Sequence, residues 1–234
     1  MNSITNVVRL VTRLARLFPM LVAVIFVVPF AVSANIKNKF TEDQKKAEKI
    51  LSKYAASAGI TIDIEKIDEK KTLGTKKVTQ GTLSVAGKKF NLTTMGDKKT
   101  EIILNAQKIW LIEYPDPDFD PGGKRRVTEL SKNQPELAKQ IVNLFSSPQK
   151  FFSNFSVSNT ELKSDLLILT LNPKSKDLKS FQIVFDAKNS QLNSIQFVDD
   201  IDTQTTLVFK KYDFASKLPT KLFEFKKLKT DEVF

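Results

Sequence analysis

Three aspartates in a proline- and glycine-rich segment have the spacing of calcium ligands. Asp116, Asp118 and Asp120 match the first, third and fifth positions of an EF-hand loop. The match then ends, because the sixth position requires glycine and is Pro121, and the twelfth requires glutamate and is Val127. We therefore expect a solvated loop at 115–123 and no metal site.

The other polar residues give little support for an enzyme. Asp199 and Asp200 are adjacent carboxylates, as a carboxylate-based hydrolase would need, but the sequence around them is turn-like, where solvated acids are ordinary. The chain has no cysteine and no histidine, which excludes Ser-His-Asp and Cys-His nucleophilic sites, Cys/His zinc sites and disulfides. It also lacks the glycine-rich loops that bind nucleotide phosphates. We expect no enzymatic activity and no cofactor.

The charge of the chain is basic but dispersed. Its 234 residues include 37 Lys and Arg and 26 Asp and Glu, which gives a formal net charge of +11. The lysines are scattered among acids, and beyond residue 34 the arginines are Arg125 and Arg126. Proteins that read nucleic acid favour clustered charge and arginine. We expect no nucleic-acid partner, and we expect a protein that meets anionic lipid surfaces or acidic partners.

Residues 1–34 have the pattern of a secretory signal peptide. Three arginines are their only charges, and an apolar run at 17–32 follows them. This run of about 16 residues is shorter than the roughly 20 that span a bilayer. It ends with small residues, Val32 and Ala34, at positions −3 and −1 of a signal-peptidase site. We expect cleavage after Ala34 and a periplasmic domain at 35–234, with an uncleaved membrane anchor as the alternative.

The hydrophobic pattern of 35–234 predicts one mainly β domain of the α+β type. Apolar spacing predicts a helix over about 42–58, with Thr41 as its N-cap. From residue 60 the period becomes two, and the short turns between about eleven such runs require antiparallel pairing. The exception is 134–153, where the spacing is helical again. We expect a single curved antiparallel sheet, open like an incomplete barrel, with a helix before it and a helical insertion in mid-chain.

The apolar face of such a sheet needs a cover, which the first helix and the insertion can supply. The lid candidates in the insertion are Leu137, Ile141, Leu144, Phe151 and Phe152. The sheet-side candidates are Leu83, Phe90, Leu92, Trp110, Phe181, Ile183 and Phe197. These side chains either form a filled core or line a cavity for a hydrophobic ligand. The sequence leaves both possibilities open, and a one-residue slip would exchange the inward and outward sets.

Several segments recur here in the order and spacing of a known family. They are GTLSV at 81–85 with Phe90 and Leu92, IWLIEYP at 109–115, LTLNPK at 169–174, LKSFQIV at 178–184, IQF at 195–197, LP at 218–219, FEF at 223–225 and TDEV at 230–233. Over nearly its whole mature length the chain resembles the LolA-like periplasmic carriers of outer-membrane lipoproteins.

This resemblance implies an open, incomplete β-barrel whose mouth is covered by helices. It also implies a function. The protein would bind the acyl chains of lipoproteins, receive them from an inner-membrane ABC transporter, and deliver them to an outer-membrane receptor or membrane. The resemblance implies no catalytic residue, and we expect a monomer.

Two departures from the family pattern bear on this expectation. Characterised members carry an arginine just after the GTLSV-like strand, where it hydrogen-bonds the lid closed. Here 86–89 reads AGKK, so Lys88 is the candidate latch, although an ammonium does not reproduce a guanidinium fork. The family's Asp-x-x-Gly is also missing from DDIDT at 199–203. A carrier of another lipid or glycolipid, or an envelope sensor or interaction domain on the same scaffold, is therefore the alternative.

Overall fold

In the computed structural model the chain falls into two units, whose bounds are given below. The described backbone covers residues 28–105, 108–130, 136–174, 176, 178–199, 201–214 and 217–234. Side chains are described from residue 41 onward, except those of 131–138 and of the gaps just given. The contacts divide the chain into Met1–Glu42 and Asp43–Phe234. The following description concerns the second unit, and the predicted signal peptide lies mostly outside the described residues.

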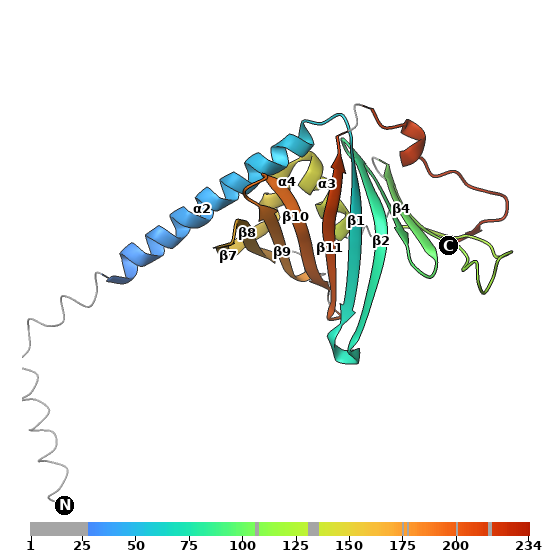
Figure 1. Ribbon diagram of the computed structural model, residues 1–234, viewed down its shortest axis with the longest axis horizontal. Helices are drawn as coiled ribbons and strands as arrows, with labels where there is room; N and C mark the ends of the chain where they lie inside the picture. Colours follow the sequence, from blue (N-terminus) through green and yellow to red (C-terminus); the bar gives the residue numbers. More distant parts are fainter. Residues whose placement is uncertain are drawn as a thin grey trace, which may run out of the picture. The chain divides into compact units, whose positions relative to one another are not determined.

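Twelve strands of the described residues form one sheet (Figure 1). They are β1 (Ile60–Lys70), β2 (Thr75–Ala86), β3 (Lys89–Met95), β4 (Lys99–Asn105), β5 (Lys108–Glu113), β6 (Arg126–Glu129), β7 (Phe155–Lys163), β8 (Leu166–Pro173), β9 (Leu178–Asp186), β10 (Gln191–Asp199), β11 (Thr203–Asp213) and β12 (Glu232–Val233). Their order is β12-β6-β5-β4-β3-β2-β1-β11-β10-β9-β8-β7. The predicted mainly β fold with an open sheet is confirmed. The pairing of β12 with β6 is parallel, so the sheet is mixed rather than purely antiparallel.

The helices are α2 (Val28–Ala55), α3 (Glu136–Ser146) and α4 (Pro148–Ser153), with short 3-10 turns at η1 (Lys71–Leu73) and η2 (Thr220–Phe223). The prediction that a helix starts after Thr41 is wrong, because α2 already begins at Val28. Between Pro29, which fits the first turn of a helix, and Gly59 the sequence holds no proline or glycine that would interrupt it.

The path of the chain explains how α3 and α4 come to lie over the sheet. Strand β6 lies near one edge and β7 forms the opposite edge, so the two do not pair and the sheet stays open. The connection between them contains α3 and α4, and it must cross from one edge to the other. Figure 1 shows the sheet curving around these two helices.

The main core lies between the concave face of the sheet and the helices. On β1 the alternation is direct, because Ile60, Ile62 and Ile64 are buried while the residues between them are more exposed. Leu51 of α2 and Leu144 of α3 belong to the same cluster. The helices therefore shield the apolar face from water.

A smaller cluster forms on the opposite, convex face. Ile103, Ile112 and Val127 are buried there, with Trp110 and Phe225 packed against them. The residues after β11 supply the cover, and the Asn91 side chain donates a 2.7 Å hydrogen bond to the carbonyl of Leu222 in η2.

An ion pair fixes the end of this C-terminal segment beside β6. The Arg125 guanidinium donates two hydrogen bonds to the Asp231 carboxylate, at 2.8 and 2.7 Å, and the carboxylate is inaccessible to solvent. Hydrogen bonding to Arg125 holds the pKa of Asp231 below its usual value. The parallel addition of β12 follows, because the chain returns to this edge after crossing the convex face.

Candidate functional site

A cavity of about 140 Å³ lies between the concave face and α3. Its lining residues are Lys66, Phe90, Leu92, Ile102, Ile109, Leu130, Ile141, Phe197, Thr205 and Leu207. All of them are apolar except Lys66 and Thr205. The cavity is therefore suited to an apolar group, with one polar wall.

Strand register brings these side chains together from both halves of the sheet. In the first half Leu92 lies opposite Ile102, and Phe90 lies opposite Leu104, which in turn faces Ile109. In the second half Phe197 lies opposite Thr205. The two halves meet at β1, where Lys66 faces Leu207.

Six of the seven sheet-side candidates are buried on this concave face, in the main cluster. Phe90, Leu92 and Phe197 line the cavity. Leu83, Phe181 and Ile183 do not line it and are fully buried in the filled part of the core. The cavity is thus the unfilled end of a face that is otherwise packed.

Trp110 does not share that face, and the prediction that it does is wrong. Its ring stacks on Phe225 at a centroid distance of 5.4 Å on the convex side. The segment around it is apolar in both positions of the two-residue period, because Ile109 serves the main core and Ile112 the smaller one. Periodicity alone could not choose between the faces.

The lid candidates pack as tightly as the sheet does. Ile141 reaches the cavity, and Leu144, Phe151 and Phe152 are buried in the main cluster. The ring of Phe151 lies 5.6 Å from that of Phe181 across the interface between α4 and the sheet. The side chain of the fifth candidate, Leu137, lies outside the described residues. The helices α3 and α4 therefore cover the concave face in this structure.

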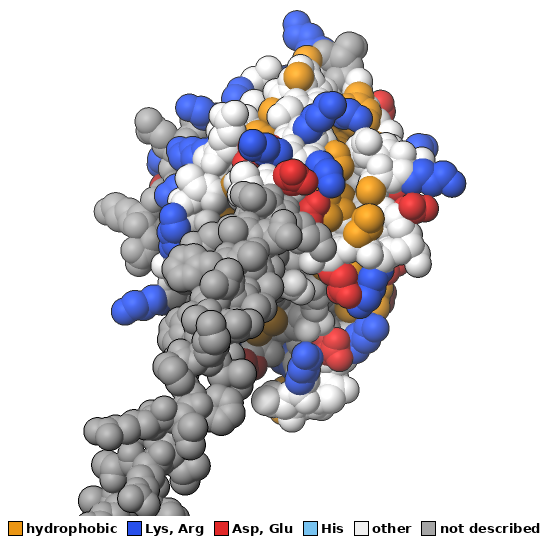
Figure 2. Space-filling model, turned by 90° about the vertical axis from the view of Figure 1, so that its left-hand side faces the viewer, with side chains coloured by type: hydrophobic (Ala, Val, Ile, Leu, Met, Phe, Trp, Pro, Cys, Tyr) orange, Lys and Arg blue, Asp and Glu red, His pale blue; other side chains and the backbone are white. Residues whose placement is uncertain are grey.

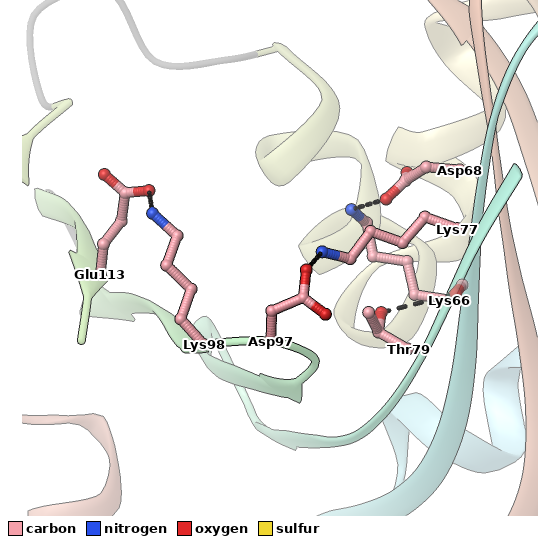
Figure 3. A network of polar contacts seen from close by, with 7 residues as sticks. All are labelled: Lys66, Asp68, Lys77, Thr79, Asp97, Lys98 and Glu113. Carbon is pink, nitrogen blue, oxygen red and sulfur yellow. Dashed lines mark hydrogen bonds and ion pairs between the residues drawn. The ribbon is translucent and has the colours of Figure 1, made fainter. Parts of the chain in front are cut away.

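The polar wall of the cavity is an ion pair held by a threonine. Lys66 and Asp68 form a salt bridge of 2.5 Å on β1, and the Thr205 hydroxyl donates a 2.8 Å hydrogen bond to the same carboxylate. Figure 3 shows this pair beside two others, Lys77 with Asp97 and Lys98 with Glu113. Along β1 the concave face therefore changes from apolar to charged, so the deep end can hold hydrocarbon and the outer end remains hydrated.

Tyr54 ties the C-terminal end of α2 to strand β10, and Tyr212 of β11 packs against its ring. The Tyr54 hydroxyl accepts a 2.9 Å hydrogen bond from the backbone N–H of Leu192, and the Tyr212 hydroxyl donates to the carbonyl of the same residue. Burial raises the pKa of both phenols above the usual value. Both phenols therefore stay neutral into the alkaline range, and the neutral hydroxyl of Tyr212 can donate to the Leu192 carbonyl.

The charged residues on the rest of the described surface are largely dispersed. Asp116 accepts a 2.9 Å hydrogen bond from the N–H of Asp118 within its own loop, and no group of three or more acidic residues in the described part could hold a metal ion. None of the helices described is both long and apolar enough to cross a bilayer. On the face drawn in Figure 2, lysines and arginines are scattered among acids.

A family profile described as outer membrane lipoprotein carrier protein LolA matches residues 57–226 of this chain. The chain belongs to the LolA family. The sheet, its cavity and its helical cover therefore form a scaffold of the lipid-binding carrier type. A comparison with curated proteins gives no match.

Solved structures with a similar chain path have low identity to this LolA-family chain. A LolA superfamily protein from Nitrosomonas europaea is 10% identical, with a TM-score of 0.42 over 79% of this chain and 97% of that one. An uncharacterised conserved protein from Thermus thermophilus is 9% identical, with a TM-score of 0.45 over 84% of this chain and 99% of that one. A chain of the MucA/MucB complex of Pseudomonas aeruginosa is 6% identical, with a TM-score of 0.37 over 79% of this chain and 61% of that one. These values support no functional assignment.

The predicted LolA-type latch is not made by Lys88 in this structure. Lys88 forms no hydrogen bond or ion pair with another described residue. It lies on the wall of a second hollow, of about 600 Å³, beside α3 and α4. The helices α3 and α4 are held on the sheet by apolar contacts, of which those of Ile141 and Phe151 are examples.

Several lining residues were missed at the level of sequence. Ile102, Ile109 and Leu207 lie on strands that the periodicity found. Strand register places them opposite Leu92, Leu104 and Ile195 respectively, and periodicity does not give that register. Lys66 carried no signal of its own, because a lysine that continues an Ile-x-Ile-x-Ile alternation is expected to be exposed.

Proposed function

We propose that this protein is a periplasmic carrier that binds the acyl chains of lipoproteins in its apolar interior. It takes them from an inner-membrane ABC transporter and delivers them to an outer-membrane receptor or membrane. The observation that supports this best is an apolar cavity roofed by the Ile141 side chain, in a chain of the LolA family. Each methylene buried from water is worth about 0.8 kcal/mol, so an acylated protein needs such a shelter to cross an aqueous compartment. The function requires no nucleophile, metal or cofactor.

The size of the cavity implies that the lid moves. A volume of about 140 Å³ is well below the roughly 300–1,000 Å³ of ordinary ligand pockets. An acyl chain can therefore enter only if α3 and α4 move away from the sheet. Each buried Leu, Ile or Phe of the lid stabilises the closed state by about 1.5–3 kcal/mol, and the acyl chains replace these contacts. This exchange keeps the net affinity low enough for release.

The absence of cysteine allows a direct test. A single thiol introduced by Gln149→Cys on the exposed side of α4 carries an environment-sensitive fluorophore, and Lys188→Cys in the β9–β10 turn is the control. A triacylated lipopeptide should change the emission of the first conjugate and not of the second, whereas the same peptide without acyl chains should change neither. No response to the acylated peptide would contradict the proposal. Binding without later transfer to vesicles would favour a sensor domain over a carrier.

A further inference from the structure

The second hollow lies on the side of α3 that faces away from the apolar cavity. Its lining residues are Gly87, Lys88, Leu104, Lys139, Val142, Asn143, Ser146, Ser147 and Lys150. Ile141, which roofs the cavity, and Asn143, which lines the hollow, are two positions apart on α3. Two positions correspond to about 200° around a helix. One helix therefore separates an apolar space from a polar one.

The described lining residues of this hollow carry positive charges and no negative ones. Three lysines, Lys88, Lys139 and Lys150, line it, and none of its described lining residues is acidic. Lys88 comes from the β2–β3 turn and Lys150 from α4, so the charges converge from two separate elements. No carboxylate of the described residues pairs with Lys88 or Lys150, although ion pairs are frequent elsewhere on the surface, as at Lys77.

A buried amide in the same wall lacks a partner. Asn143 is 7% exposed, and its Nδ2 is inaccessible and makes no hydrogen bond. Ser147 stands next to it at the start of α4, and its hydroxyl does not cap that helix. Buried polar groups are nearly always hydrogen-bonded. An unsatisfied donor beside two unpaired ammonium groups indicates that an external acceptor completes the site.

We propose that this hollow binds the phosphate group of an amphipathic lipid, whose acyl chains occupy the apolar cavity when the lid opens. The inference rests on the proposed function, because it needs an interior that accepts acyl chains. The hydroxyl of Ser147 donates to a phosphate oxygen, and Lys88 and Lys150 neutralise the charge. The Asn143 amide, inaccessible in the closed arrangement, adds its hydrogen bond once α3 moves as the lid opens. A carboxylate or a phosphodiester carries a single negative charge, whereas a terminal phosphate monoester, as in phosphatidate, carries up to about two near neutral pH, which better matches several ammonium groups around one space.

The test compares two lipids that differ only in the phosphate. Full-length protein is titrated with fluorescent phosphatidate and with diacylglycerol of identical acyl chains. The double variant Lys88→Gln/Lys150→Gln should weaken phosphatidate binding by about tenfold for each ammonium group removed, and should leave diacylglycerol binding unchanged. Lys217→Gln/Lys229→Gln removes the same charge from exposed positions elsewhere and should change neither. Equal reductions in affinity for both lipids, or an unchanged affinity for phosphatidate, would overturn the assignment.

A second variant and a second probe separate this inference from the proposed function. Asn143→Leu should reduce the preference for phosphatidate while leaving the melting temperature unchanged or higher, because it removes an unsatisfied buried donor. If neither lipid binds wild type, the carrier function fails, and calorimetry with inorganic phosphate then tests the hollow alone. Phosphate binding that disappears in the double lysine variant would assign the site to free phosphate. No phosphate binding to wild type in that case would reject the site.

Discussion

Filling the apolar cavity should stabilise the protein and weaken its binding of acyl chains. Empty volume in a core costs about 24 cal/mol per Å³, so a cavity of about 140 Å³ corresponds to about 3 kcal/mol. Leu92 lies on its wall, and Leu92→Phe adds three carbon atoms that can project into the space. Because the new ring fills part of the volume, the free energy of unfolding should rise by about 1–2 kcal/mol.

The same change should weaken binding through the closed lid. The added contacts exist only while α3 covers the sheet, so the closed state gains the same 1–2 kcal/mol relative to the open one. A ligand that binds the open state must overcome this difference, and its apparent affinity falls by a factor of about 5–30. Lid position and ligand affinity are therefore linked by one measurable free energy.

Urea denaturation and displacement of an apolar dye by a synthetic acylated peptide measure the two quantities. Leu169→Phe is the matched control, because Leu169 is fully buried in the main cluster but does not line the cavity. Overpacking there should cost about 1–3 kcal/mol. If Leu92→Phe destabilises as Leu169→Phe does, the cavity does not exist in solution. If Leu92→Phe stabilises without weakening the peptide, acyl chains do not use this space.

Four further outcomes are expected. Ile141→Glu should displace the lid while circular dichroism keeps its β signature, because a charge is costly to bury against an apolar face; a loss of cooperative unfolding would show that α3 is indispensable core. Asp231→Asn should flatten the acid limb of stability against pH, because a carboxyl with a lowered folded pKa stabilises above its unfolded pKa of about 3.9 and loses that contribution as pH falls. Tyr212→Phe should flatten the alkaline limb, because a phenol with a raised folded pKa stabilises fully below about pH 10 and progressively less above it. Intact mass of protein recovered from the periplasm should begin at Asn35, and full-length chain in the membrane fraction would support an anchor.

Much of the architecture follows from the local pattern of the sequence. The alternation at Ile60, Ile62 and Ile64 defines a strand with one buried face, and the short connection to the following strand leaves antiparallel pairing as the sole option for those two. The helical spacing that contains Ile141 and Leu144 interrupts the strands in mid-chain and predicts a cover. These features depend on residues close in sequence, and periodicity reports on such residues directly.

Tertiary structure decided what depends on distant residues. The apolar Trp110 on the convex face is shielded from water by Phe225, and that contact joins segments far apart in the chain. The parallel strand at the C-terminal end depends in the same way on the pairing of Arg125 with Asp231. The volume of the cavity depends on more separate segments than any of these features. It is the small difference between the space enclosed by several strands and a helix and the space that their side chains fill, and no single segment contains that difference.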